Sequence, residues 1–111
     1  MSLRPFAALI LVAFAPLAIA KGSVEAGATK SQVCQACHGS DGNGTGDGQY
    51  PRIAGQYADY LAKTLREYRS GERKNVIMAG FAGTLTDQDI EDLAAFYSAQ
   101  KGPLTDLSHM K

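Results

Sequence analysis

Two cysteines and a histidine in the first half of the chain have types and a spacing that could do chemistry together. Cys34-Gln35-Ala36-Cys37-His38 follows the pattern C-x-x-C-H, which marks covalent haem attachment of the c type. Two cysteines three positions apart on a helical turn point the same way, so each thiol can form a thioether with one vinyl group of haem. We therefore predict one covalently attached haem c, with Cys34 and Cys37 as its attachment points and His38 as the proximal ligand of its iron.

Three other uses of the cysteine pair explain the pattern less well. A thioredoxin-type redox pair follows a strand in a βαβ pattern, and no strand pattern precedes Cys34. A structural zinc ion needs four ligands, and beyond residue 20 the cysteines and histidines are only Cys34, Cys37, His38 and His109. A disulfide across so short a loop would add little stability and would leave His38 without a role.

A second axial ligand has few possible sources. Met78 lies in the glycine-containing stretch 75–85, whereas His109 and Met110 belong to the last three residues of the sequence. A segment beyond Gly102-Pro103 is expected to be poorly ordered, which disfavours a ligand there. Met78 is the better candidate, and the alternative is that its side chain only fills core space. A neutral thioether favours Fe(II), so a His/Met pair would raise the reduction potential.

The elements that must position these residues are helical. We expect a first helix from about 24 to 36, with Ser23 as its N-cap, running directly into Cys34. Residues 39–48 contain five glycines together with Asp and Asn, so they should form a loop. A second helix is expected to end near Gly71, because its aromatic and leucine residues repeat at helical spacing. These residues are Tyr57, Tyr60, Leu61, Leu65 and Tyr68.

The last third of the chain begins with a predicted loop and ends in a predicted helix. Residues 75–85 contain Gly80 and Gly83 and are expected to form an ordered loop. Thr86 then provides an N-cap for a helix that Gly102-Pro103 should end. No part of 21–111 shows useful strand alternation, so the sequence predicts an all-α fold of three main helices around the haem.

The first twenty residues have the composition of a targeting segment. Sixteen of them are apolar, they begin with a positive charge at Arg4, and Ala18-Ile19-Ala20 is a sequence that signal peptidase accepts. The uncharged run is shorter than the ~20 residues that cross a bilayer. We predict that 1–20 is a cleaved signal peptide and 21–111 a periplasmic cytochrome c-like domain that does not span a membrane. The alternative is an uncleaved N-terminal anchor.

The charge balance also limits the partners that the chain can have. The 11 basic and 11 acidic residues cancel, which disfavours a nucleic-acid-binding protein.

Large apolar residues are scarce beyond residue 20, so a domain of this size needs a contribution from outside the chain to complete its core. An apolar haem ring would supply it.

Four segments resemble the class I c-type cytochromes, above all small bacterial monohaem cytochromes and each half of the dihaem cytochrome c-four type. They are CQACHG at 34–39, PRIAGQYADYL at 51–61, RKNVIMAGFAGTLTDQDI at 73–90 and DLAAFYS at 92–98. The resemblance implies a helical fold around one haem, His38 and Met78 as its axial ligands, and a role in electron transfer. A single C-x-x-C-H departs from the dihaem pattern.

The resemblance also implies residues that support the haem. A metal-bound histidine usually donates its other N–H to a carbonyl, and the class I pattern assigns that carbonyl to Pro51. Gly27 and Phe96 match a close crossing of the first and last helices. Tyr57, Tyr60 and Leu61 are expected to line the haem pocket, although an aromatic helix face is also typical of an ordinary core. Four polar residues are possible propionate ligands, and the sequence does not distinguish among them: Arg52, Arg73, Lys74 and Asn75.

The expected function is electron transfer without catalysis, with one haem iron alternating between Fe(II) and Fe(III) in a respiratory chain. The expected partners are redox proteins such as a quinol–cytochrome c reductase complex, a terminal oxidase or a periplasmic reductase. One alternative is a haem subunit of a larger periplasmic oxidoreductase. A weaker one is an open-site haem enzyme or gas sensor, which would need a distal polar group, and the other histidine is the terminal His109.

Overall fold

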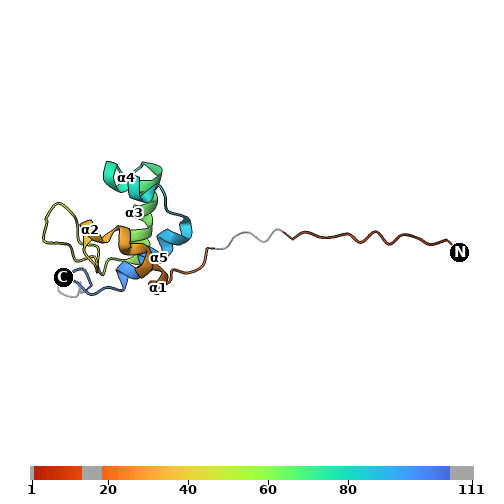
Figure 1. Ribbon diagram of the computed structural model, residues 1–111, viewed down its shortest axis with the longest axis horizontal. Helices are drawn as coiled ribbons and strands as arrows, with labels where there is room; N and C mark the ends of the chain where they lie inside the picture. The colour runs from red at the N-terminus through yellow and green to blue at the C-terminus, as the bar shows by residue number, and fades with distance from the viewer. Residues whose placement is uncertain (1, 14–18, 106–111) are drawn as a thin grey trace, which may run out of the picture.

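The computed structural model describes residues 2–13 and 19–105, and in these ranges it contains helices and no strands. The elements are α1 (Val24–Lys30), the 3-10 turn η1 (Ser31–Val33), α2 (Gln35–His38), α3 (Ala58–Ser70), α4 (Val76–Ala82) and α5 (Asp87–Ser98). Figure 1 shows α1 and α5 together on one side of the domain, and α3 with α4 on the other. The predicted all-α fold class is confirmed.

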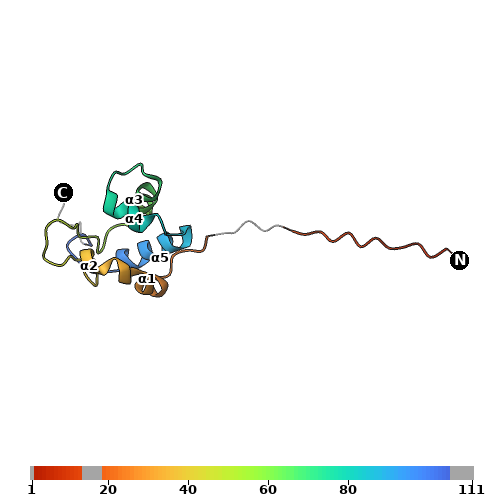
Figure 2. The ribbon, with the colours of Figure 1, turned by 45° about the horizontal axis from the view of Figure 1, so that its top comes forward.

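The N-terminal segment lies apart from the helical domain. Residues 2–13 are extended and run away from the helices in both ribbon views (Figures 1 and 2). No helix in the described ranges is long and apolar enough to cross a membrane. Ala18 of the expected cleavage site lies outside the described residues, and signal-peptide cleavage stays a prediction.

The helix expected over 24–36 is broken into three pieces. Ser23 caps α1 as predicted, and its hydroxyl accepts a hydrogen bond from the N–H of Ala26 at 3.1 Å. At the end of α1 the Ser31 hydroxyl donates to the carbonyl of Ala28 at 2.7 Å, which competes with the regular helical hydrogen bonds. The chain then tightens into η1, and the N–H of Cys34 reaches the Ser31 carbonyl at 2.8 Å. Cys34 therefore sits at a junction rather than inside one long helix.

Helices α3 and α5 form where the sequence predicts them. Gly71 ends α3 in the left-handed conformation, with φ of 87°. Thr86 and Asp89 make a reciprocal capping box at the start of α5. Helix α5 ends at Ser98, earlier than the Gly102-Pro103 stop that we expected. Two ion pairs join α3 to α5: Arg66–Glu91 at 2.5 Å and Arg69–Asp87 at 2.6 Å.

The predicted loop over residues 75–85 is wrong, because most of it forms α4. Asn75 caps this helix, and its side-chain oxygen accepts from the N–H of Met78 at 3.0 Å. Gly80 lies inside the helix without breaking it, because a short capped helix tolerates one glycine at a cost of about 1 kcal/mol. Helix α4 packs mainly against α3.

A close crossing joins α1 to α5, the two helices at the ends of the domain. A Cβ atom added at Gly27 would collide with the carbonyl oxygen of Asp92 and would lie 2.6 Å from the Cβ of Phe96. The crossing that we predicted for Gly27 and Phe96 is therefore present, and it requires a residue without a side chain.

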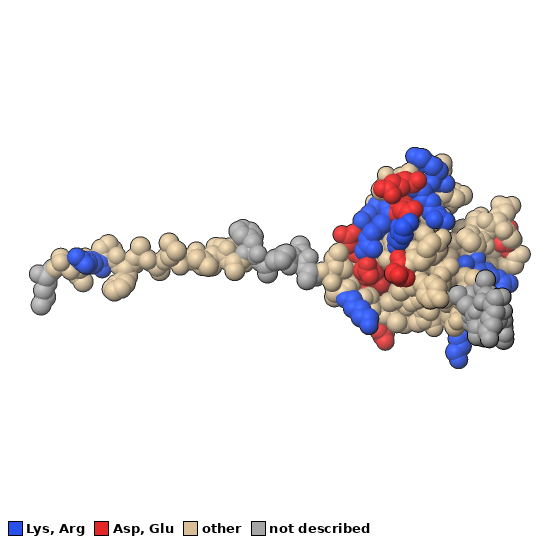
Figure 3. Space-filling view, turned by 180° about the vertical axis from the view of Figure 1, so that it is seen from behind, with Lys and Arg blue, Asp and Glu red and all other residues tan. Residues whose placement is uncertain are grey.

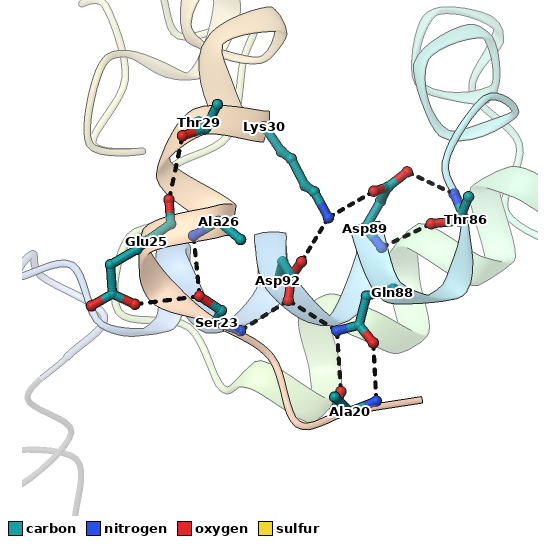
Figure 4. Close-up of polar contacts among 10 residues, drawn as sticks. All are labelled: Ala20, Ser23, Glu25, Ala26, Thr29, Lys30, Thr86, Gln88, Asp89 and Asp92. Atoms are coloured by element: carbon teal, nitrogen blue, oxygen red, sulfur yellow. Dashed lines mark hydrogen bonds and ion pairs between the residues drawn. The ribbon is translucent and has the colours of Figure 1, made fainter. Parts of the chain in front are cut away.

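Polar contacts around the carboxylate of Asp92 reinforce the crossing (Figure 4). Asp92 is buried, with 3% of its surface exposed, and it accepts from the Ser23 N–H at 2.9 Å and the Lys30 ammonium at 2.6 Å. Lys30 also pairs with Asp89 at 2.8 Å. These contacts lower the pKa of Asp92 and raise the pKa of Lys30, because each charge stabilises the other. The apolar core beside them comes from α3 and α5: Leu61, Ala62, Ile90, Leu93, Ala94 and Tyr97.

Candidate haem site

A cavity of about 460 Å³ brings together all four residues expected to attach the haem or bind its iron. Cys34, Cys37 and His38 enter its wall from the segment around α2, and Met78 enters from α4. The other wall segments are the loop before α3, the face of α3 and the inner face of α5. The cavity size lies in the range of small-molecule and cofactor sites. Residues far apart in the sequence thus converge on one cavity.

A single helical turn presents the cysteines and the histidine. The N–H groups of Cys37 and His38 both point to the Cys34 carbonyl, at 3.4 and 3.0 Å. Gly39 ends this turn with φ of 82°, a conformation that favours glycine, and the chain leaves directly into the glycine-rich loop. No disulfide joins Cys34 to Cys37. Burial raises the pKa of the Cys34 thiol.

The loop after the turn returns to orient the ring of His38. Backbone hydrogen bonds fold it back, from Gly44 N–H to the His38 carbonyl and from Ile53 N–H to the Gly42 carbonyl, both at 2.8 Å. This brings the Pro51 carbonyl to 2.9 Å from Nδ1 of His38, whose side chain is buried. A carbonyl can only accept, so Nδ1 carries the proton and Nε2 keeps the lone pair that a metal needs.

The expected pocket residues divide into two groups. Tyr60 and Leu61 line the cavity from α3, and Leu61 is also part of the buried core. Tyr57 does not line the cavity, and 64% of its surface is exposed. Tyr57 is the N-cap of α3 and has a non-helical backbone, so it does not continue the helix face.

Several cavity residues were not assigned to the haem pocket from the sequence. Tyr97 is buried, and its hydroxyl has no hydrogen-bond partner among the described residues. Burial raises its pKa. Thr64, Leu65 and Tyr68 extend the α3 wall beyond Leu61. Their repeat at helical spacing with Tyr60 and Leu61 was a usable signal, because one helix face should line one cavity.

The residues of the cavity fit a haem better than a bare metal ion. Most of the wall is aliphatic or aromatic, and none of its described residues is acidic. In the described ranges, no three Cys, His, Asp or Glu side chains come together as ligands for an ion. A large apolar ring with its own metal needs only two attachment thiols and two axial ligands from the chain, and this cavity offers a set of that kind.

Comparison with known proteins agrees with this geometry. Residues 24–100 match the family described as Cytochrome c. The chain belongs to the cytochrome c family. The family carries covalently bound haem c and transfers electrons, so the predicted cofactor and the resemblance to class I cytochromes are confirmed.

Individual relatives show how much of each protein the chain matches. Cytochrome c-554(548) of Halomonas halodenitrificans is 43% identical over 83 residues, which are 72% of this chain and 99% of that protein. The crystal structure of reduced recombinant cytochrome c4 from Pseudomonas stutzeri superposes with a TM-score of 0.69 at 43% identity, covering 73% of this chain and 47% of the other. This chain spans about half the length of the cytochrome c4 relatives that it matches.

A third relative has a more specific name. The protein named Thiosulfate dehydrogenase electron acceptor from Thiomonas intermedia is 39% identical over 82 residues, which are 74% of this chain and 38% of that protein. The chain therefore resembles both general cytochromes and one named for its redox partner.

Proposed function

We propose that the chain is a periplasmic electron carrier that holds one haem c through Cys34 and Cys37, with His38 and Met78 as axial ligands. The observation that carries this proposal is the meeting of these four side chains in one cavity whose wall is largely apolar. When bound, haem supplies the redox chemistry, a reversible change between Fe(II) and Fe(III). Because the protein provides both axial ligands, no coordination position is left for a substrate.

The chain's own residues set the electronic properties of the site. The Pro51 carbonyl holds the proton on Nδ1 of His38, which fixes the ring and increases the basicity of Nε2. The neutral sulfur of Met78 favours the ferrous state and so raises the reduction potential. The cap that Asn75 provides to α4 positions the backbone of Met78. Apolar side chains around the cavity exclude water and keep the charge change on the iron shielded.

The ligand assignment is tested by spectra of the mature holoprotein in both redox states. Met78→Ala should remove the near-infrared band of sulfur–iron charge transfer, admit carbon monoxide to the ferrous protein and lower the reduction potential, because the ligand that favours Fe(II) is lost. Met110→Ala and His109→Ala are the matched controls, and their positions lie outside the described residues. A normal band in Met78→Ala, or its loss in either control, would overturn the assignment.

A haem subunit of a larger oxidoreductase is the second candidate function. Its support is the relative named Thiosulfate dehydrogenase electron acceptor. The cavity and the ligands would be the same in both cases, and only the permanence of the partner would differ. Native mass measurement of the protein purified from its own cells distinguishes the two: a mass equal to one chain plus haem supports the carrier, and a stable assembly supports the subunit.

Export to the periplasm and redox partners there complete the proposal. The apolar composition of 1–20 and its small residues at 18–20 support a cleaved leader. A quinol–cytochrome c reductase complex, a terminal oxidase or a periplasmic reductase would suit a His/Met haem at the oxidising end of a respiratory chain. N-terminal sequencing should find Lys21 first, and a protein that still begins at Met1 would refute cleavage.

A further inference from the structure

The haem cavity has an unbalanced positive charge. Of its described lining residues, Arg52 and Arg73 are charged and none is acidic. Basic side chains elsewhere on α3 are neutralised: Lys63 pairs with Glu67, Arg66 with Glu91 and Arg69 with Asp87. Figure 3 shows the result on one face, where basic and acidic side chains are interleaved. Arg52 and Arg73 make no such ion pair with a described carboxylate.

Arg73 differs from Arg52 because the protein holds its side chain in position. Its Nε donates to the hydroxyl of Tyr68 at 3.1 Å, and its guanidinium lies over the Tyr68 ring, 5.4 Å from the ring centre. The Tyr68 hydroxyl, with a smaller contribution from Tyr60, raises the pKa of Arg73. The backbone is fixed as well, since the N–H of Arg73 donates to the Glu67 carbonyl at 3.2 Å.

The arrangement leaves Arg73 with unused donors at the cavity wall. Guanidinium has five N–H donors in a planar fork that matches a carboxylate, and only Nε is bonded to Tyr68. A haem carries two propionate carboxylates, which are the negative charges that this cavity lacks. Arg52 has no comparable side-chain hydrogen bond among the described residues, and Lys74 does not line the cavity.

We propose that Arg73, held by Tyr68, is the residue that binds a haem propionate and so positions the ring and tunes its potential. This inference rests on the proposed haem site. It assigns the role to one of the four polar residues that the sequence could not distinguish. A cation near the ring disfavours the added positive charge of Fe(III), so Arg73 raises the reduction potential. It also keeps the propionate ionised.

The test measures the midpoint potential of the mature holoprotein between about pH 5 and pH 8, where propionate ionisation can be followed. Arg73→Gln should lower the potential at neutral pH and move the pKa of the redox-linked ionisation upward. Lys74→Gln removes the same charge from the next position and should leave that ionisation where it is. Arg73→Lys should fall between wild type and Arg73→Gln, because it keeps the charge and loses the fork.

Other titratable groups near Arg73 do not account for that ionisation. The titratable groups near it on α3 are Tyr60, Lys63, Tyr68 and Glu67, whose carboxylate pairs with Lys63, and Glu72 and Lys74 are its neighbours in sequence. Glu67 is unchanged in every variant. Glu72 is present in wild type and in every variant, so it cancels in the comparison.

Tyr68→Phe separates positioning from charge. It keeps the guanidinium and removes the hydroxyl that orients it, so the ionisation should shift in the same direction as in Arg73→Gln but by less. This variant carries the test if Arg73→Gln yields no holoprotein. Identical pH profiles for wild type and Arg73→Gln would overturn the proposal, as would a Lys74→Gln profile that matches Arg73→Gln. An intact sulfur–iron band in these variants shows that such a failure concerns Arg73 and leaves the ligand assignment standing.

Discussion

The crossing of α1 with α5 and the short helix α4 are held in opposite ways. At the crossing, Gly27 lies against the backbone of Asp92, and the buried carboxylate of Asp92 ties the two helices together. Helix α4 packs mainly on α3, and its Val76 and Ile77 side chains are 92% and 57% exposed. Its cap comes from Asn75, which is also exposed.

The contrast shows which side of the haem site is held in place by protein contacts and which side has few of them. The segment of Cys34 and His38 continues directly from α1 and is anchored by the crossing. Met78 belongs to α4, which has few buried contacts of its own, so the bond from its sulfur to iron would be a main restraint on that helix. Regions with few buried contacts open locally at low free-energy cost. The two sides should therefore respond very differently to matched substitutions.

The largest difference is expected from the same substitution made on the two sides. Gly27→Ala should destabilise the protein by more than about 3 kcal/mol, because the new methyl group collides with the Asp92 carbonyl and with Phe96. Gly80→Ala should stabilise it by about 0.5–1 kcal/mol, because the space around Gly80 is open and alanine is the better helix former. Denaturant unfolding of both holoproteins measures the two effects. Equal changes of the same sign would contradict the contrast.

An intermediate effect is expected from the buried carboxylate. Asp92→Asn should cost about 2–3 kcal/mol of unfolding free energy, because the Lys30 ammonium loses its buried partner. The control is Glu91→Gln on the same helix, whose pair with Arg66 is more exposed and should cost under about 1 kcal/mol. Chemical denaturation at neutral pH compares the variants, and a larger loss in the control would refute the special role of Asp92.

The Asp92 effect should also depend on pH with a definite sign. Because the folded pKa of Asp92 is lowered, its contribution is fully present above its unfolded pKa of about 3.9 and is lost as the pH falls through the folded value. The pKa of Lys30 is raised, so its contribution persists below about pH 10 and is lost as the pH rises through the raised value. The gap between wild type and Asp92→Asn should therefore be constant near neutrality and close in acid. A constant gap down to about pH 2 would argue against a charge effect.

The smallest effect is expected at the cap of α4. Asn75→Ala removes the acceptor of the Met78 N–H and should lower the free energy of local opening of α4 by about 1 kcal/mol. Amide hydrogen exchange should show faster exchange in α4 and unchanged exchange in α5. Asn75→Asp keeps a capping oxygen and should exchange like wild type. Equal acceleration in both helices would mean that α4 opens only together with the rest of the domain.

The sequence predicts this molecule best where a motif or a stop signal is local. The C-x-x-C-H turn, the end of α3 at Gly71 and the start of α5 at Thr86 each depend on a few adjacent residues, and each is present. Helix α4 was missed because its seven residues are nearly all apolar and give no amphipathic period. The usable signal was Asn75, a capping residue placed directly before that apolar run.

Contacts that depend on where the chain turns at the ends of a helix could not be predicted in the same way. The spacing of Tyr57 fits the α3 face, but its backbone is not helical. The contact of Arg73 with Tyr68 arises because the chain turns back at Gly71, and the backbone bond to Glu67 then fixes that turn. Helical periodicity describes which residues share a face, and it does not specify where the chain goes once the helix has ended.

The close crossing has a consequence for the order in which the chain can fold. Lys30 and Asp92 are 62 residues apart, so the contact that closes the domain joins its two ends. A chain that emerges from its N-terminal end cannot form this contact until nearly all of it has appeared, and closing so long a loop costs entropy that local helices do not repay. Until α5 has emerged, it cannot cover the segment that contains the thiols of Cys34 and Cys37. The two cysteines proposed to attach the haem are therefore accessible before the cavity around them exists.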